Sequence, residues 1–244
     1  MSTQKDLYRS YAGTHYAHTA LMRDASYEQM SHFYRGNYLR HLPRDRSAPI
    51  CELGCGAGHF LYFLRKEGYT NLVGVDLSED LVKTCQDMGF ANVEYGDALS
   101  FLQQRPAAFS AVVCNDLIEH IPRAQMIEFV SAAHGSLKEG AFIVKTINAG
   151  SLFGAREVFV DFTHEVGFTP ESLTQVLRMG GFPSPEILPL RPIPQRIQGH
   201  LVKLLNVAAI EPLIKGFITV TEGPAARTPM VVTQTMLAVA PIIR

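Results

Sequence analysis

Between Ile50 and Asn148 the chain alternates short apolar runs with longer amphipathic segments. The runs are rich in β-branched residues and apolar at odd and even positions alike, as in strands buried on both faces. They are PICELG, NLVGVDL, NVEYGDA, SAVVCND and AFIVKTIN, and between them lie HFLYFLRKEG, SEDLVKTCQDMG and RAQMIEFVSAAHGSLKEG. This alternation predicts a parallel sheet with helices on both faces.

The segment 123–140 is predicted to form a helix of the core. Apolar side chains recur at helical spacing at Met126, Ile127, Val130 and Ala133. Gly140 is predicted to end this helix, since glycine commonly follows a helix C-terminus.

The chain after Asn148 predicts a long loop, a helix and two more strands. The loop covers 149–169, the helix runs from Pro170 to about Met179, and the strands are PEILPL and VVTQTMLAVA. Thr169 is expected to cap the helix, with Pro170 at its first position and Phe168 packed on Leu173. We therefore expect an N-terminal helical cap, 1–49, and one domain, 50–244, that carries an insertion at about 191–229.

The insertion begins with an amphipathic helix that is expected to break near Pro212. One face carries Ile197, Leu201, Leu204, Leu205 and Ala208. Because its polar face holds few basic residues, packing on the chain's own sheet or on a second subunit is favoured over a membrane surface. A peripheral membrane contact through 197–218 and a homodimer both stay open.

Composition narrows the functional classes. The 244 residues, 47% of them hydrophobic, suffice for one sizeable core. Twenty-two Lys and Arg against 23 Asp and Glu give a net charge of −1, which disfavours nucleic acid as a partner. The four cysteines have neither zinc-ligand spacing nor the density of a disulfide scaffold. With neither a secretory signal nor a membrane-spanning run in the sequence, we expect a cytoplasmic protein.

The first strand is followed by the glycine-rich turn CELGCGAGHF, which suits close approach of backbone to a ligand. A dinucleotide fingerprint needs a small residue three positions after Gly56, where this chain has histidine. Asp76 lies 20 positions after Gly56, where a carboxylate accepts ribose hydroxyls, and Asp97 ends the third strand, where it can accept from an adenine amino group. The predicted ligand is an adenosine, with no evidence for a pyrophosphate.

At this point the sequence resembles the class I S-adenosylmethionine (SAM)-dependent methyltransferases, from about Ile50 to the C-terminus. ELGCGAG, GVDLS, GDA and NDLIEHIP match four motifs of that family in order. The resemblance implies a Rossmann-like α/β fold with a seven-stranded mixed sheet of order 3-2-1-4-5-7-6, the last strand antiparallel, helices on both faces and a helical insertion between strands 6 and 7. It also implies SAM as the cofactor and S-adenosylhomocysteine as the product.

The same resemblance assigns cofactor contacts residue by residue. It places the glycine-rich loop, with Gly54, Cys55, Gly56 and Gly58, around the methionine part, and Glu52 orients this loop. Asp76 is placed on the ribose, Leu77 on the adenine face, and Asp97 with Ala98 at the adenine edge. Asn115 is placed at the amino group of the cofactor, mostly through its backbone carbonyl.

A hydroxyl acceptor requires a general base, most often histidine. Ligands in such sheets bind beyond the carboxyl ends of the strands, so His120 and His164 both qualify. The stretch DFTHE…FTPESL is similar to one in a subset of bacterial methyltransferases of surface-glycan and other saccharide pathways. We predict His164, oriented by Asp161 or Glu165, as the base or as a hydroxyl ligand, ahead of His120. Glu119 and His120 form the EH pair of this family, for which support of the loops near the cofactor is favoured over catalysis.

The predicted function is SAM-dependent methylation of a hydroxyl on a small acceptor, preferably a saccharide or glycan intermediate, which can be lipid-linked. The alternatives are methylation of nitrogen, carbon or a phenol of a natural product or quinone precursor, and a non-catalytic cofactor-binding protein. A magnesium ion at Asp161, His164 and Glu165 is conceivable, but a metal-free site is the expectation.

Overall fold

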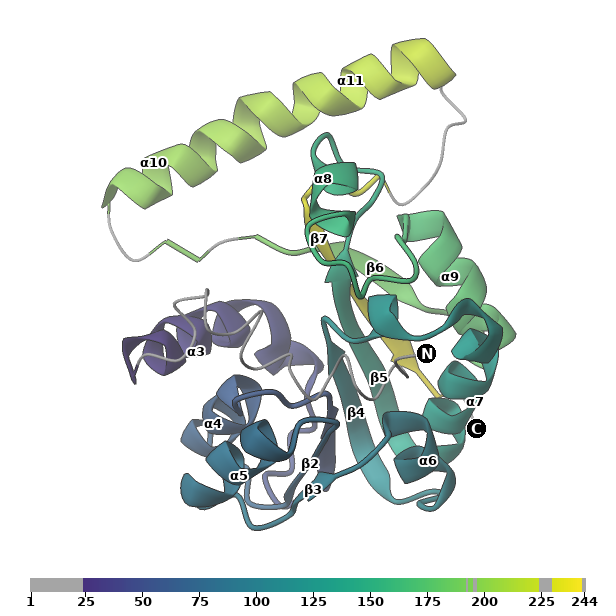
Figure 1. Ribbon diagram of the computed structural model, residues 1–244. Coiled ribbons are helices and arrows are strands. Elements are labelled where there is room, and N and C mark those ends of the chain that lie inside the picture. Colours follow the sequence, from purple (N-terminus) through teal and green to yellow (C-terminus); the bar gives the residue numbers. More distant parts are fainter. Residues whose placement is uncertain (1–23, 192, 195–196, 224–229, 243–244) are drawn as a thin grey trace.

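The computed structural model describes residues 24–191, 193–194, 197–223 and 230–242 (Figure 1). The part of the predicted N-terminal cap before Asp24, and the end of the predicted insertion at 224–229, lie outside the described residues.

The seven-stranded sheet has the predicted strand order, β3-β2-β1-β4-β5-β7-β6. The first five strands in sequence pair in parallel, whereas β7 is antiparallel to both β5 and β6. The strands are β1 (Ile50–Leu53), β2 (Leu72–Asp76), β3 (Val93–Tyr95), β4 (Phe109–Asn115), β5 (Leu137–Ile147), β6 (Glu186–Pro189) and β7 (Thr235–Pro241). The fold class is therefore confirmed.

Helices cover both faces of the sheet (Figure 1). The first group contains α3 (Asp24–Tyr38), α4 (His59–Lys66) and α5 (Glu79–Asp87). The second group, on the other face, contains α6 (Ala98–Gln103), α7 (Met126–Ser136) and α9 (Pro170–Met179). Side chains alternate between the two layers along β4, where Val112 packs with the second group and Val113 with the first.

The helix over 123–140 ends earlier than predicted. After the 3₁₀ turn Arg123–Gln125, α7 stops at Ser136 and β5 begins at once. Gly140 does not end the helix; it lies inside β5 beside a register irregularity with β4. Its φ is +76°, and a Cβ atom there would overlap the carbonyl oxygen of Ser110. Close approach of two strands, rather than a helix stop, explains this glycine.

The start of α9 confirms the predicted cap. The Thr169 side chain accepts a hydrogen bond from the Ser172 backbone amide at 3.3 Å, and the Ser172 hydroxyl bonds the Thr169 amide at 2.9 Å. Phe168 and Leu173 are both buried in the same core cluster. This part of the loop is architectural.

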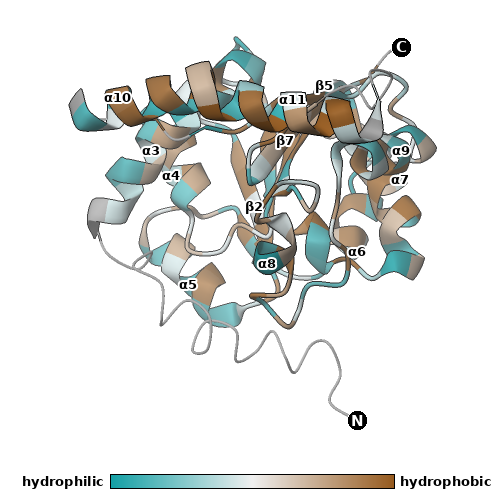
Figure 2. Ribbon diagram, turned by 90° about the horizontal axis from the view of Figure 1, so that it is seen from above, coloured by the Kyte–Doolittle hydropathy of each residue, from teal (hydrophilic) through white to brown (hydrophobic). Residues whose placement is uncertain are grey.

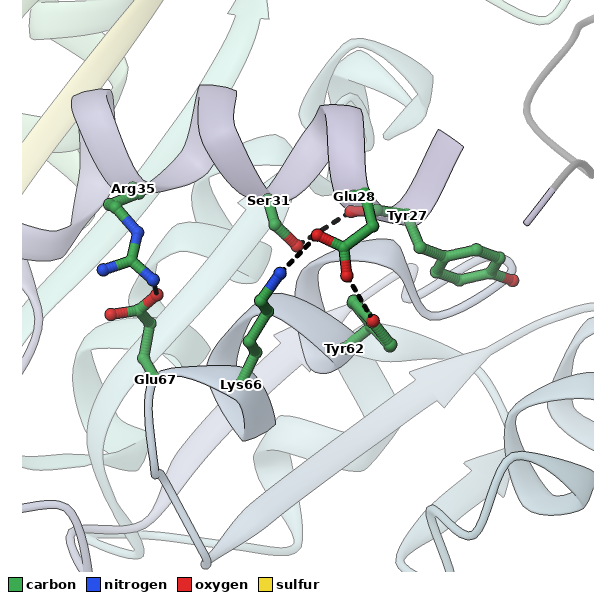
Figure 3. A network of polar contacts seen from close by, with 7 residues as sticks. All are labelled: Tyr27, Glu28, Ser31, Arg35, Tyr62, Lys66 and Glu67. Atoms are coloured by element: carbon green, nitrogen blue, oxygen red, sulfur yellow. Dashed lines mark hydrogen bonds and ion pairs between the residues drawn. The ribbon is translucent and has the colours of Figure 1, made fainter. Parts of the chain in front are cut away.

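Polar contacts hold α3 on α4 (Figure 3). Glu28 accepts a hydrogen bond from the Tyr62 hydroxyl at 2.7 Å and pairs with Lys66. About two turns further along α3, Arg35 pairs with Glu67. Beneath these contacts, the aromatic rings of Tyr34 and Tyr38 in α3 pack against Phe60 and Phe63 of α4. The helix is thus fixed by an apolar underside and a polar margin.

The insertion forms a helical arm, defined here as residues 197–222, that stands off the body (Figure 1). It consists of α10 (Ile197–Leu205), a π turn (Asn206–Ile210) and α11 (Glu211–Glu222). The helix does not break near Pro212, because this proline falls in the first turn of α11, where its missing amide hydrogen is tolerated. The irregularity is the π turn that precedes it.

The apolar face of the arm points away from the sheet. Leu201, Leu204 and Leu205 are 62%, 63% and 58% exposed, whereas Lys203 and Asn206 are half-buried. Figure 2 shows the apolar residues along both helices of the arm. The prediction that this face packs on the chain's own sheet is therefore wrong. None of the described helices has the length and apolarity needed to cross a bilayer.

Candidate active site

A cavity of about 380 Å³ opens at the carboxyl ends of β1, β2 and β4 and collects most of the predicted site. The volume suits a small-molecule ligand. The predicted cofactor residues on its wall are Glu52, Gly54, Cys55, Gly56, Asp76, Leu77, Asp97, Ala98 and Asn115, and the predicted acceptor-side residues are His120, Asp161 and His164. Gly58 and Glu165 do not line it.

The glycine-rich loop between β1 and α4 uses backbone geometry that other residues rarely adopt. Gly54, Gly56 and Gly58 have φ values of +63°, +51° and +79°. The amide groups of Gly54 and Cys55 both donate to the Val75 carbonyl, at 2.8 and 3.2 Å. A Cβ atom on Gly58 would lie 2.9 Å from the sulfur of Cys85, so this glycine serves packing behind the loop rather than the cavity wall.

Asp76 ties the glycine-rich loop to the end of β2. Its Oδ2 accepts from the Gly56 amide at 2.8 Å, and its Oδ1 accepts from the Ser78 amide at 2.9 Å. Burial raises the pKa of this carboxyl, and the amide donors act against that rise. Each carboxylate oxygen can accept a second hydrogen bond, so ribose hydroxyls can still be bound.

Asp97 has two roles in the structure. It lines the cavity and it caps α6, where its Oδ1 accepts from both the amide and the hydroxyl of Ser100 at 2.9 Å. Sequence reasoning did not predict α6, a six-residue helix.

Glu52 offers an unsatisfied acceptor inside the cavity. The residue is 3% exposed; its Oε1 accepts from the Asn115 amide nitrogen at 3.2 Å, and its Oε2 is buried without a hydrogen-bond partner. The Tyr38 hydroxyl donates to Asn115 Oδ1 at 2.8 Å. Burial raises the pKa of the Glu52 carboxyl well above its usual range. A cationic or hydrogen-donating ligand group would satisfy this oxygen.

The two predicted histidines lie together. His120 belongs to the 3₁₀ turn after β4 (Ile118–His120) and His164 to the loop after β5, yet their ring centroids are 4.7 Å apart. The Nδ1 atom of His164 lies 2.8 Å from the Val158 carbonyl oxygen. Because a carbonyl oxygen can only accept, Nδ1 carries the proton and Nε2 the lone pair in the neutral ring. This is the tautomer that a general base at Nε2 requires.

The orienting partner of His164 differs from the prediction. The Val158 carbonyl holds the ring, a role that the sequence analysis gave to Asp161 or Glu165. Asp161 instead accepts from the hydroxyl of Thr163 at 2.7 Å, and that hydroxyl lies 3.0 Å from His120 Nδ1. Glu165 is exposed and contributes its backbone amide. A backbone carbonyl leaves no signal in the sequence, which is why this partner was missed.

Glu119 joins the two loops. Its carbonyl oxygen accepts from the amides of Glu165 and Val166 at 2.8 and 3.1 Å, and its Oε2 accepts from the Thr146 hydroxyl at 2.9 Å. Burial raises the pKa of its carboxyl to about 8, while burial and the neighbouring His164 lower the pKa of His120. The loop-supporting role predicted for the EH pair fits these contacts.

Several cavity residues were not predicted as site residues. Met30 and Tyr34 reach the cavity from α3, and His59 reaches it from the start of α4. The His59 ring stacks on Tyr27 at 4.2 Å, and its Nε2 lies 3.0 Å from the Ser26 hydroxyl. The helical cap thus completes one wall of the cavity. The tyrosines scattered through residues 1–49 were the available sign of a packed helix, but the sequence does not say where these side chains pack.

Comparison with known proteins gives a consistent picture. A family model described as a methyltransferase domain matches residues 27–182, more than half of the chain. The chain is 29% identical over 106 residues to a ubiquinone biosynthesis O-methyltransferase of Leptothrix cholodnii, and 32% identical over 107 residues to one of Xylella fastidiosa. Each match covers 41% of this chain and 44% or 42% of the relative, so the chain matches less than half the length of these relatives.

Solved structures share the fold at low sequence identity. A SAM-dependent methyltransferase from Archaeoglobus fulgidus superposes with a TM-score of 0.66 at 22% identity, covering 89% of this chain and 95% of that one. Phosphoethanolamine N-methyltransferase 2 of Haemonchus contortus, in complex with S-adenosylhomocysteine, has a TM-score of 0.58 at 16% identity and covers 96% of this chain and 59% of its own. At this level of identity the likeness shows the fold alone.

Proposed function

This chain belongs to the methyltransferase-domain family, and from that premise we propose that it transfers the methyl group of SAM to a hydroxyl of a small acceptor. In this transfer the carbon–sulfur bond of the methyl group breaks, a carbon–oxygen bond forms, and the electron pair stays on the sulfur of S-adenosylhomocysteine. The proton of the hydroxyl leaves to a base. The ubiquinone biosynthesis O-methyltransferases named above support oxygen as the acceptor atom.

The residues at the β1–β2 side fit the cofactor. The buried, unpartnered Oε2 of Glu52 suits the ammonium group of the methionine part, and Gly54 and Gly56 leave no side chain at these two positions of the cavity wall. Asp76 would bind the ribose, with Leu77 against the adenine and Asp97 with Ala98 at its edge. When bound, SAM supplies the methyl group and its leaving group; the protein aligns the acceptor with it.

One observation carries the assignment of the base: the 2.8 Å contact of His164 Nδ1 with the Val158 carbonyl oxygen. It leaves the lone pair on Nε2 of a half-buried ring on the cavity wall. His164 would accept the proton of the acceptor hydroxyl, and His120, with its lowered pKa, would stay neutral beside it.

The charge of the wall points to an uncharged acceptor. The described residues that line the cavity include seven carboxylate side chains and no lysine or arginine. They are Glu52, Asp76, Asp97, Asp116, Glu119, Glu157 and Asp161. A polyanionic acceptor such as a sugar nucleotide would find no cationic side chain on this wall to pair with. A saccharide or glycan intermediate stays a prediction, and the ubiquinone biosynthesis O-methyltransferases among the relatives support the alternative, a phenol of a quinone precursor.

The exposed apolar face of the helical arm is a candidate contact surface for a binding partner. Its outward apolar face can be covered by a membrane surface at 197–218 or by a second copy of the chain, and both stay predictions.

The test is SAM binding to the purified full chain by calorimetry, followed by incubation with SAM and a panel of neutral saccharides, catechols and sugar nucleotides. We expect S-adenosylhomocysteine and an O-methylated product, identified by mass spectrometry, from a neutral acceptor. A product methylated on nitrogen or carbon would contradict O-methylation, and SAM binding with no turnover across the panel would favour the non-catalytic alternative.

A further inference from the structure

Glu119, His120 and His164 place one potential metal ligand each within 4.8 Å of one another. Two come from the turn after β4 and one from the loop after β5, and all three line the cavity. The sequence analysis considered a magnesium site at Asp161, His164 and Glu165. Among the described residues, the group whose ligand atoms come close enough to share a metal ion is instead Glu119, His120 and His164.

Both histidines are arranged as metal-binding histidines commonly are. Such a ring donates one N–H to a carbonyl or carboxylate and presents its other nitrogen to the cation. His164 Nδ1 has the Val158 carbonyl at 2.8 Å, and His120 Nδ1 has the Thr163 carbonyl at 3.2 Å. In each neutral ring the lone pair therefore lies on Nε2.

Glu119 supplies an independent observation that points to a ligand. The residue is 2% exposed; its Oε2 accepts from Thr146, while its Oε1 is buried without a hydrogen-bond partner. Buried polar atoms are nearly always satisfied, and each exception calls for an explanation such as a missing ion. A cation beside Oε1 would provide the missing partner.

The surrounding charge favours a cation. Asp116, Glu157 and Asp161 line the same cavity, and of these Asp116 pairs with Lys145. Glu52 in β1 and Asp76 at the end of β2 are assigned to the ammonium group and the ribose of SAM, so the cofactor does not account for the acidic residues on the β4–β5 side.

We propose that Glu119, His120 and His164 bind a divalent first-row transition-metal cation at the acceptor end of the cavity. Two imidazole nitrogens and one carboxylate oxygen are a ligand set that such cations accept, and three protein ligands leave coordination positions open. Its catalytic consequence rests on the proposed function: a hydroxyl acceptor in an open position would be acidified by the cation. In the loaded protein His164 would be a ligand and the proton of the acidified hydroxyl would leave to solvent, whereas in the metal-free protein His164 is the base that takes it.

The test measures the cation directly. The full chain is stripped with EDTA and titrated with Co²⁺, followed by visible absorption, and with ZnCl₂, followed by calorimetry. We expect one cation per chain, and binding weakened about tenfold or more by Glu119→Gln and by His164→Gln. His200→Ala, an exposed position on the arm, should bind as the wild type does.

Absence of stoichiometric binding, or equal binding by the wild type and both ligand variants, would overturn the proposal. If Glu119→Gln does not fold, His164→Gln decides, because this side chain is only half-buried. SAM binding to the same stripped samples is measured in parallel: loss of metal binding with SAM binding retained separates the metal proposal from the proposed function.

Discussion

The rings of His120 and His164 lie with their centroids 4.7 Å apart and their planes tilted by 55°. Burial, and after it the neighbouring His164, lower the pKa of His120. This relationship joins the loops after β4 and β5 at the place where the acceptor is proposed to bind.

Replacing His164 by alanine should remove turnover but keep SAM binding. A general base contributes roughly a hundredfold or more to the rate, whereas the cofactor residues lie on other loops. Initial rates and SAM calorimetry measure the two effects. His200→Ala is the control, and unchanged turnover in His164→Ala would refute the assignment.

Asp76→Asn should weaken SAM binding by roughly ten- to a hundredfold, because hydrogen bonds to a charged group contribute about 1.5–3 kcal/mol each. One oxygen remains to accept from the loop, so the fold should persist. Calorimetry of SAM binding gives the ratio. Asp87→Asn, at an exposed ion pair on α5, provides the matched control; equal affinities of the two variants would contradict a ribose contact.

Gly140→Ala should destabilise the protein by at least about 2 kcal/mol, since it combines a left-handed backbone with overlap on the Ser110 carbonyl. Gly68→Ala isolates the backbone effect, because Gly68 has φ +89° but no atom within 4 Å of its Cβ position. That variant should lose only about 1 kcal/mol. Urea denaturation measures both, and equal losses would remove the steric part of the explanation.

Glu119 should make stability fall as pH rises. Its pKa is about 8 in the folded chain against a usual value of 4.5, so between these values the folded state binds the extra proton. The stabilisation is complete below about pH 4.5 and is lost as the pH rises through about 8. In EDTA, the fall in melting temperature from pH 5.5 to pH 8.5 should therefore be smaller in Glu119→Gln than in the wild type. An unchanged fall would mean that this carboxyl titrates normally.

Leu205→Ser should leave stability within about 0.5 kcal/mol, because this side chain is 58% exposed. Leu173→Ala, in the buried core, should cost about 2–5 kcal/mol. Sedimentation and liposome flotation of the Leu201→Ser, Leu205→Ser double variant would then show which partner covers the arm. Loss of a dimer or of flotation identifies it, and a large loss of stability would mean that the face packs on the body.

The features that follow from local sequence pattern were predicted, whereas contacts with particular backbone atoms were missed. The apolar runs located all seven strands, and Thr169 with Pro170 located the start of α9. Gly140 was misread because its neighbour, the Ser110 carbonyl, is brought to it only by sheet pairing. The Val158 carbonyl that sets the tautomer of His164 was invisible for the same reason.

The contacts that hold α3 on α4 and those that hold the glycine-rich loop should respond differently to dissolved salt. Its polar margin is made of ion pairs whose side chains are partly exposed, such as Lys66 with Glu28, at 40% and 50%. Pairs of this kind are screened by dissolved ions. The glycine-rich loop is held by backbone hydrogen bonds, which ions hardly affect. Raised ionic strength should therefore loosen the attachment of α3 to α4 more than it changes the conformation of the glycine-rich loop.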